Sequence, residues 1–161
     1  MATIRVGMAQ LAIAKSPDRL ETQALGSCVG TVLYDSYSKI GGISHAMLPD
    51  IAESKTSSRG NLAKFVNTAL EQLVDKMIRH GARKKNIKAR LVGGVNMFPD
   101  IKIYLLHIGK RNTDAARLYL EKADIQIIAE EIGGNFGRTI TLDTETGSLH
   151  VRTIAHGEKE I

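Results

Sequence analysis

A long amphipathic helix is the sequence feature that most restricts how this chain can fold. Between residues 61 and 80, apolar side chains recur at steps of three and four positions, so they line one face of a helix. They are Leu62, Phe65, Val66, Ala69, Leu70, Leu73, Val74, Met77 and Ile78. Gly81 follows as a C-terminal cap, and Arg79 and His80 complement the helix dipole. The apolar face must be buried against another element, and the neighbouring segments are strand-like.

Short β-rich segments make up most of the remaining chain. We predict strands at residues 4–13, 29–34, 40–48, 87–92, 104–108, 125–129, 138–142 and 149–154. A second helix is predicted over residues 113–122, with Asn112 as its N-cap. The strands do not simply alternate with helices. We therefore expect an α+β fold, a single domain over residues 1–161 with helices packed on a mostly antiparallel sheet or pair of sheets.

Cysteine and histidine usage limits the possible chemistry. The chain has one cysteine, Cys28, so an intrachain disulfide and a multi-cysteine zinc site are both excluded. The five histidines show no metal-ligand spacing, so we expect no metal and no cofactor. No apolar run approaches the roughly 18 residues of a spanning helix, and the N-terminus does not read as a signal peptide. These features predict a cytoplasmic protein with a free thiol and no membrane insertion.

The formal net charge is +5, and basic residues cluster between positions 79 and 90. Such a cluster favours an acidic partner, or it is simply a solvated loop after a helix. No aromatic residue interleaves the cluster and no groove-reading motif is present, so we expect no nucleic-acid partner.

A candidate nucleophile lies in the sequence Gly26-Ser27-Cys28-Val29-Gly30. Glycines two positions before and after the cysteine match the spacing of a nucleophile elbow, and they permit a tight turn. A strand follows instead of a helix, so an α/β-hydrolase fold is not implied. A cysteine at the head of a strand can leave its backbone N–H free to stabilise an oxyanion. The alternative is that Cys28 is a small buried apolar residue.

His45 is the candidate base for that thiol. Residues 28 and 45 flank the polar segment 35–39 almost equally, so a hairpin would place them across or diagonal from each other. Histidine has a suitable pKa for activating a thiol. The alternative is a core histidine bonded to the backbone. A third polar group often orients such a base, and Thr22, Ser27 and Ser44 are all candidates that spacing does not separate.

Five sequence blocks, in order along the chain, resemble the CheD family of chemotaxis proteins. The first two blocks are Leu25-Gly26-Ser27-Cys28, and Gly41-Gly42 with His45 and Leu48-Pro49. The others are Gly93-Gly94-Val95-Asn96-Met97-Phe98, Ile108-Gly109-Lys110-Arg111-Asn112, and Ile132-Gly133-Gly134 with Gly137-Arg138. Together they cover nearly the whole chain.

The resemblance implies a protein-glutamine deamidase without a cofactor that acts on methyl-accepting chemotaxis receptors. It implies Cys28 as nucleophile, His45 as its histidine and Thr22 as the orienting residue, and we assign Ser27 and Ser44 to substrate binding. The implied fold is an α/β sandwich related to the catalytic domain of the cytotoxic necrotizing factor deamidase toxins. The phosphatase CheC is an implied second partner, and hydrolysis of receptor glutamyl methyl esters an implied second activity. The alternative function is a non-catalytic binding module that regulates CheC.

Overall fold

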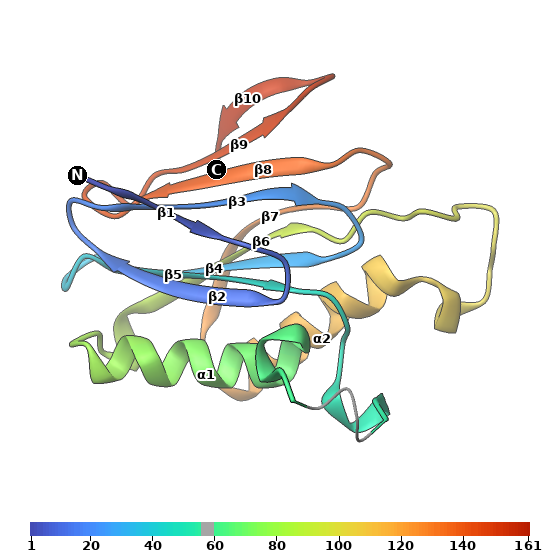
Figure 1. Cartoon of the computed structure of the whole chain (residues 1–161), viewed down its shortest axis with the longest axis horizontal. Helices are drawn as coiled ribbons and strands as arrows, with labels where there is room; N and C mark the ends of the chain where they lie inside the picture. The colour runs from blue at the N-terminus through green and yellow to red at the C-terminus, as the bar shows by residue number, and fades with distance from the viewer. Residues whose placement is uncertain (56–59) are drawn as a thin grey trace.

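Two five-stranded sheets and a layer of helices form the molecule (Figure 1). The computed structural model describes residues 1–55 and 60–161. The outer sheet has the strand order β1 (Thr3–Val6), β3 (Arg19–Leu25), β8 (Arg138–Asp143), β9 (Leu149–Thr153) and β10 (Gly157–Glu160). The central sheet has the order β2 (Gln10–Lys15), β5 (Ile40–Ala46), β4 (Val29–Asp35), β6 (Ile87–Gly93) and β7 (Gln126–Ile132). Helices α1 (Val66–Arg79) and α2 (Ile108–Lys122) cover the face of the central sheet that points away from the outer sheet.

The central sheet is buried on both faces, because one face meets the helices and the other meets the outer sheet. All seven residues of β4 and all seven of β5 are buried. One core cluster lies between the helices and the central sheet, and a second lies between the two sheets. A Cβ atom at Gly42 would lie 2.7 Å from a methyl carbon of Leu73, so glycine there lets α1 pack closely on β5.

The expected fold class is confirmed. Six of the eight strand pairings found in the described chain are antiparallel, and only β1 with β3 and β6 with β7 are parallel. β4 and β5 form the predicted hairpin around residues 36–39. No helix among the described residues is long and apolar enough to cross a membrane. The likeness to the necrotizing factor toxins stays a prediction.

The first helix begins later than its apolar stripe suggested. A short 3₁₀ helix, η3 (Leu62–Lys64), precedes α1, and the side chain of Asn61 accepts a hydrogen bond from the N–H of Ala63 at 3.1 Å. Phe65 is extended and forms an isolated bridge with Leu48. The bridge removes Phe65 from the helix although its side chain continues the apolar stripe.

The predicted strand at residues 104–108 and the predicted start of the second helix are both wrong. Tyr104–Leu106 form the 3₁₀ helix η5, and α2 begins at Ile108, five residues before the predicted start. The apolar side chains of 104–106 are exposed, so their strand-like composition does not reflect burial in a sheet. His107, which we expected in an apolar strand, is the N-cap of α2, and Asn112 lies inside the helix instead of capping it.

Two strands were missed, and the single predicted strand at 4–13 is two strands in different sheets, β1 and β2. β10 is fully exposed and carries the sequence GEKE, which has no apolar pattern. β3 alternates between buried Leu20 and Thr22 and more exposed neighbours, so its period of two was a usable signal. β3 matters most for the site because it carries Thr22. The 3₁₀ helices η1 (Ile51–Glu53) and η4 (Lys84–Asn86) complete the described elements.

Candidate active site

Cys28 lies in the loop immediately before β4. A glycine turn at the end of β6, which pairs with β4 in the sheet, holds this loop. The N–H of Gly94 donates to the carbonyl of Cys28, and the N–H of Val95 donates to the carbonyl of Gly26, both at 2.9 Å. Gly93 and Gly94 have φ values of +107° and +61°, in the left-handed region that favours glycine. A Cβ atom at Gly93 would lie 2.5 Å from the carbonyl oxygen of Cys28. The chain therefore needs glycine here to bring β6 against the cysteine loop.

The same turn frees the backbone amide of Cys28. Pairing between β4 and β6 ends at Val29 and Gly93, because β6 turns away at the two glycines. Within the part of the chain that the structure describes, no other residue accepts a hydrogen bond from the N–H of Cys28. A donor at this position can stabilise an oxyanion that forms next to the thiol.

His45 is held from behind by Thr22. His45 is on β5 and Thr22 is on β3, so the contact joins the two sheets, and both residues are 1% exposed. His45 Nδ1 lies 2.7 Å from Thr22 Oγ1, which in turn lies 2.6 Å from the carbonyl oxygen of Val6. A hydroxyl has one hydrogen, and the Val6 carbonyl can only accept it. Thr22 must therefore accept its bond from His45, which places the proton on Nδ1.

The other ring nitrogen of His45 is consequently the basic one. In a neutral imidazole with a proton on Nδ1, Nε2 carries the free lone pair. Nε2 is buried and has no hydrogen-bond partner among the described residues. A buried polar atom without a partner is uncommon in a folded protein and is typical of sites that bind or react.

A bulge in β3 gives Thr22 its position. The register between β3 and β8 shifts between Thr22 and Leu25, and Ala24 has a φ of +56°. Without the extra residue, Thr22 and Leu25 would point to opposite faces of the strand. With the bulge both are buried, Thr22 under His45 and Leu25 beside the cysteine loop.

Cys28 and His45 lie diagonally on one face of the central sheet. His45 pairs with Gly30, and the last pair of the hairpin is Val29 with Ala46. The hairpin axis is therefore displaced by one residue from the predicted centre, and Cys28 lies two positions beyond the residue opposite His45. A diagonal arrangement was one of the two predicted, and diagonal neighbours are typically about 7–8 Å apart. Cys28 belongs to the core cluster between the sheets, the same space into which His45 points.

Burial shifts the pKa of both groups toward their neutral forms. Desolvation raises the pKa of the Cys28 thiol, against a smaller lowering effect from its own backbone N–H. Desolvation also lowers the pKa of His45. A neutral thiol and a neutral imidazole are thus the favoured resting pair, with the imidazole lone pair on Nε2.

Ser27 and Ser44 have different surroundings. Ser27 lies on the wall of a cavity of about 130 Å³ that residues 95–98 and 106–109 complete, directly beside Cys28 in sequence. Ser44 precedes His45 on β5, so its side chain points to the helix-covered face, away from Thr22. Its hydroxyl is buried without a partner among the described side chains. The structure brings Ser27 close to the candidate site and separates Ser44 from it; a substrate-binding role for either stays a prediction.

Comparison with known proteins identifies the family. A family model described as CheD chemotactic sensory transduction matches residues 47–153. A protein of Clostridium tetani is 47% identical over 158 residues, covering 98% of this chain and 94% of its own length. A protein of Clostridium botulinum strain Hall is 45% identical over 159 residues, covering 98% and 97%. Both are named probable chemoreceptor glutamine deamidase CheD. This chain belongs to the CheD family.

The sequence blocks that suggested the CheD family converge on the cysteine loop. Gly93–Gly94 clamp the loop, and the N–H of Gly133 donates to the carbonyl of Gly93 at 2.9 Å. Gly109, in the first turn of α2, packs so closely on Gly94 that a Cβ atom would clash with backbone there. Gly93 and Gly94 directly follow the predicted strand at 87–92, and this position was a signal that they could hold another segment in place.

Asn112 is the residue whose role sequence reasoning missed. Its side chain is 0% exposed, and Nδ2 donates to the carbonyl oxygens of Ser27 and Met47, both at 2.9 Å. Interpreting it as an N-cap placed it at the start of the helix, where its side chain would have bonded its own backbone. Because α2 begins at Ile108, Asn112 lies inside the helix, and its side chain points toward the sheet.

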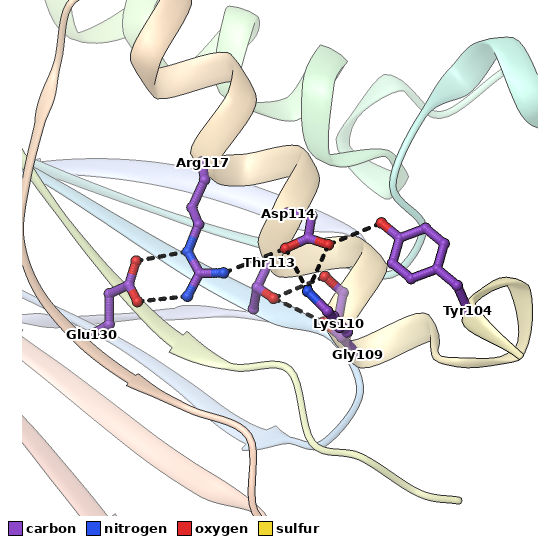
Figure 2. A network of polar contacts seen from close by, with 7 residues as sticks. All are labelled: Tyr104, Gly109, Lys110, Thr113, Asp114, Arg117 and Glu130. Carbon is purple, nitrogen blue, oxygen red and sulfur yellow. Dashed lines mark hydrogen bonds and ion pairs between the residues drawn. The ribbon is translucent and has the colours of Figure 1, made fainter. Parts of the chain in front are cut away.

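An ion network fixes the CheD helix α2 to its surroundings (Figure 2). Lys110 donates to Asp114 at 3.0 Å, the hydroxyl of Tyr104 donates to Asp114 at 2.9 Å, and Arg117 binds Asp114 and Glu130. Burial alone would raise the pKa of Asp114, but the hydrogen bonds from Lys110 and Tyr104 hold it below its usual value. The network ties η5 and β7 to the helix that carries Asn112.

Proposed function

We propose that this chain is a chemoreceptor glutamine deamidase that converts receptor glutamine side chains to glutamate and releases ammonia. Two relatives that span almost the whole chain carry that name. The observation that carries the proposal is the chain of contacts from Val6 through Thr22 to His45, which leaves His45 Nε2 basic and unpartnered on the face shared with Cys28.

The first half of the reaction is acyl transfer to Cys28. His45 Nε2 takes the thiol proton as the sulfur attacks the amide carbon of the glutamine side chain. The carbonyl oxygen becomes an oxyanion, and the free N–H of Cys28 donates to it. His45 then gives its proton to the departing nitrogen. Ammonia leaves and a γ-glutamyl thioester remains on Cys28.

The second half returns the enzyme to its starting state. His45 removes a proton from a water molecule, which attacks the thioester carbon. The carbon–sulfur bond breaks, the sulfur takes the proton from His45, and the product is a glutamate side chain. The sum is one amide and one water converted to one carboxylate and one ammonium ion, with no cofactor.

The neutral resting pair sets the order of proton transfer. Because burial disfavours both the thiolate and the imidazolium, the proton moves as the sulfur attacks and not beforehand. The ion pair then exists only when substrate covers the site, where the oxyanion donor and the Nδ1–H bond to Thr22 both stabilise it.

Further properties implied by the family belong to the same proposal. A glutamyl methyl ester can follow the same steps with methanol as leaving group, so methylesterase activity is compatible with the mechanism. The substrate is the cytoplasmic region of the receptor, which assigns the enzyme to the cytoplasm. CheC is the second proposed partner. A binding module that regulates CheC without catalysis is the competing interpretation, and ammonia release from receptor separates the two.

The test uses purified protein and a cytoplasmic receptor fragment. Ammonia release and the deamidation mass shift of receptor peptides are followed over time for the parent and for Cys28→Ala. We expect Cys28→Ala to abolish both signals, because no nucleophile remains, while the unfolding free energy changes by about 1 kcal/mol or less. Deamidation at the parental rate in a folded Cys28→Ala variant would overturn the mechanism. Unfolding of that variant would instead support a structural role for the cysteine.

A further inference from the structure

We propose that Asn112 is a positioning residue that holds the nucleophile loop against the strand of the base. The inference rests on the proposed function and adds a residue to it. The two carbonyl groups that Asn112 binds belong to Ser27, directly before the nucleophile Cys28, and to Met47, two residues after His45. One side-chain amide thus joins the two segments that must meet for proton transfer.

The position of these bonds explains why they are needed. The backbone ladder of the β4–β5 hairpin ends at Val29 and Ala46, so Ser27 and Met47 lie beyond its last pair. Past that point the N–H of Met47 donates to Lys64, outside the hairpin, and the carbonyl of Cys28 accepts from Gly94. Among the described residues, no hairpin backbone bond therefore joins the cysteine loop to the end of β5. The two N–H groups of Asn112 supply the missing link.

The chemistry of asparagine suits this task. Both of its amide hydrogens can donate at once, one to each carbonyl, whereas a hydroxyl has a single hydrogen and a carboxylate has none. The remaining atom, Oδ1, is buried, and no described group donates to it. An unpaired buried acceptor opposes stability. Asparagine at this site therefore fits a requirement for two donors better than a requirement for packing.

The helix that carries Asn112 is held rigidly on the same loop. Gly109 packs against the backbone of Gly94 and Val95, the turn that clamps the carbonyls of Cys28 and Gly26. Asp114 lies two residues further along α2 and is bound by Lys110 and Tyr104 (Figure 2). A rigid support on both sides of Asn112 is what a positioning contact requires, since a displacement of about 1 Å in reacting groups can cost about a hundredfold in rate.

The test compares Asn112→Leu and Asn112→Asp with the parent. Both keep the branched side chain of four heavy atoms and remove the two amide donors; Asp also keeps the volume, whereas Leu is larger. We expect kcat to fall about ten- to a hundredfold in both, while KM stays within about twofold, because the contact orients groups without touching substrate. The matched control is Ala116→Gly, a buried position on α2 that should lower the melting temperature without reaching the cysteine loop.

A second readout separates positioning from general destabilisation. The rate of Cys28 alkylation by iodoacetamide at neutral pH is measured with and without His45→Gln. In the parent, His45→Gln should slow alkylation, because the base that assists thiol deprotonation is lost. In the Asn112→Leu background, His45→Gln should have less than about a twofold effect, since the two residues no longer meet. Ala116→Gly should retain the parental dependence on His45.

The outcomes divide cleanly. A folded Asn112 variant with kcat within about twofold of the parent, or with alkylation still dependent on His45, overturns the inference. A loss of kcat that Ala116→Gly reproduces also overturns it. If neither Asn112 variant melts cooperatively, Asn112 is a folding residue and the positioning role is wrong. A parent protein that releases no ammonia from the receptor fragment would remove the proposed function itself, whereas loss of activity in Cys28→Ala with no loss in Asn112→Leu removes only the inference.

Discussion

The β4–β5 hairpin carries a buried ionisable side chain near each end, Asp35 and His45, and the two differ in how much of their hydrogen-bonding capacity is used. At the turn end, Asp35 is buried and its carboxylate accepts three backbone hydrogen bonds, from Tyr37 at 2.9 Å, from Ser38 at 3.2 Å and from Arg83 at 2.9 Å. At the open end, the ring nitrogen Nε2 of His45 is buried and has no hydrogen-bond partner among the described residues.

Burial alone therefore does not mark the active site. Both ends are buried to a similar degree, and both contain ionisable or polar side chains. What differs is whether the hydrogen-bonding capacity of the ionisable group, Asp35 or His45, is used up. At the turn, the Asp35 carboxylate accepts a hydrogen bond from the N–H of Arg83, which joins the hairpin to the loop after α1 and contributes to stability. At the open end, a lone pair and an N–H remain for a reacting group.

Removing the hydroxyl of Thr22 should have the largest effect, because Thr22 orients His45 at the open end of the hairpin. In Thr22→Val, His45 loses the acceptor for its Nδ1 proton, so the imidazole can adopt the other tautomer and rotate. We expect kcat to fall about ten- to a hundredfold. Burial lowers the pKa of His45, so the acid limb of kcat/KM in the parent should lie below the ordinary histidine value of about 6.5.

The pH profile gives this prediction its control. The loss in Thr22→Val should persist on the plateau above the acid limb, because there the imidazole is neutral and only its tautomer is wrong. Thr22→Ser keeps the hydroxyl and should recover most of the parental rate. Equal activity of the valine and serine variants across the profile would show that Thr22 does not orient His45.

At the turn end, Asp35→Asn should lower stability and leave catalysis unchanged. Replacing a carboxylate oxygen by NH₂ removes acceptors for backbone N–H groups, which should cost about 1–3 kcal/mol of unfolding free energy near neutral pH. Burial by itself would raise the pKa of Asp35, but the bonds from Arg83, Ser38 and Tyr37 hold it below its usual value.

The sign of the pH dependence follows from that lowered pKa. Asp35 contributes its stability above the unfolded-state pKa of about 3.9, and the contribution is lost as pH falls through the lower folded-state value. Denaturant unfolding of parent and Asp35→Asn should therefore converge in acid. A large loss of kcat in Asp35→Asn at neutral pH would contradict the separation of the two ends.

Local patterns predicted the elements whose apolar faces are buried. β4, β5 and α1 followed from β-branched runs and a stripe of period 3.6, because burial in this core selects those residues. The errors fall where the apolar side chains are exposed or absent. Residues 104–106 are apolar but lie on the surface, and β10 is a charged edge strand. Neither case leaves a periodic signal.

The candidate site was predictable in part. The glycine frame of Cys28 and the hairpin to His45 predicted the right strands, and left open whether the two residues lie across or diagonal from each other. Thr22 was one of three open candidates until the family resemblance, because β3 went unrecognised and a contact between two sheets leaves no trace in spacing. Asn112 was out of reach for the same reason, since its partners are 85 and 65 residues away.

The smallest expected effect belongs to the basic cluster, which lies near the turn end of the hairpin, away from Cys28. Lys84 and Lys85 lie in η4, just before β6, and Lys88 is the second residue of β6, whereas Cys28 is beside its last residue, Gly93. Lys88 is five residues from Gly93, about 16 Å along the strand. Charges at that distance from the reacting amide steer encounter with an acidic receptor face and do not stabilise the bound state.

The triple change Lys84→Gln, Lys85→Gln and Lys88→Gln should therefore lower the second-order rate constant at about 0.01 M salt, where the screening length is about 30 Å. At about 0.15 M the length is about 8 Å, and the effect should vanish. The turnover rate at saturating receptor should not change at either salt concentration. A triple arginine variant keeps the charge and should follow the parent. Identical salt curves for the parent and the glutamine variant would show that the cluster is only a solvated surface.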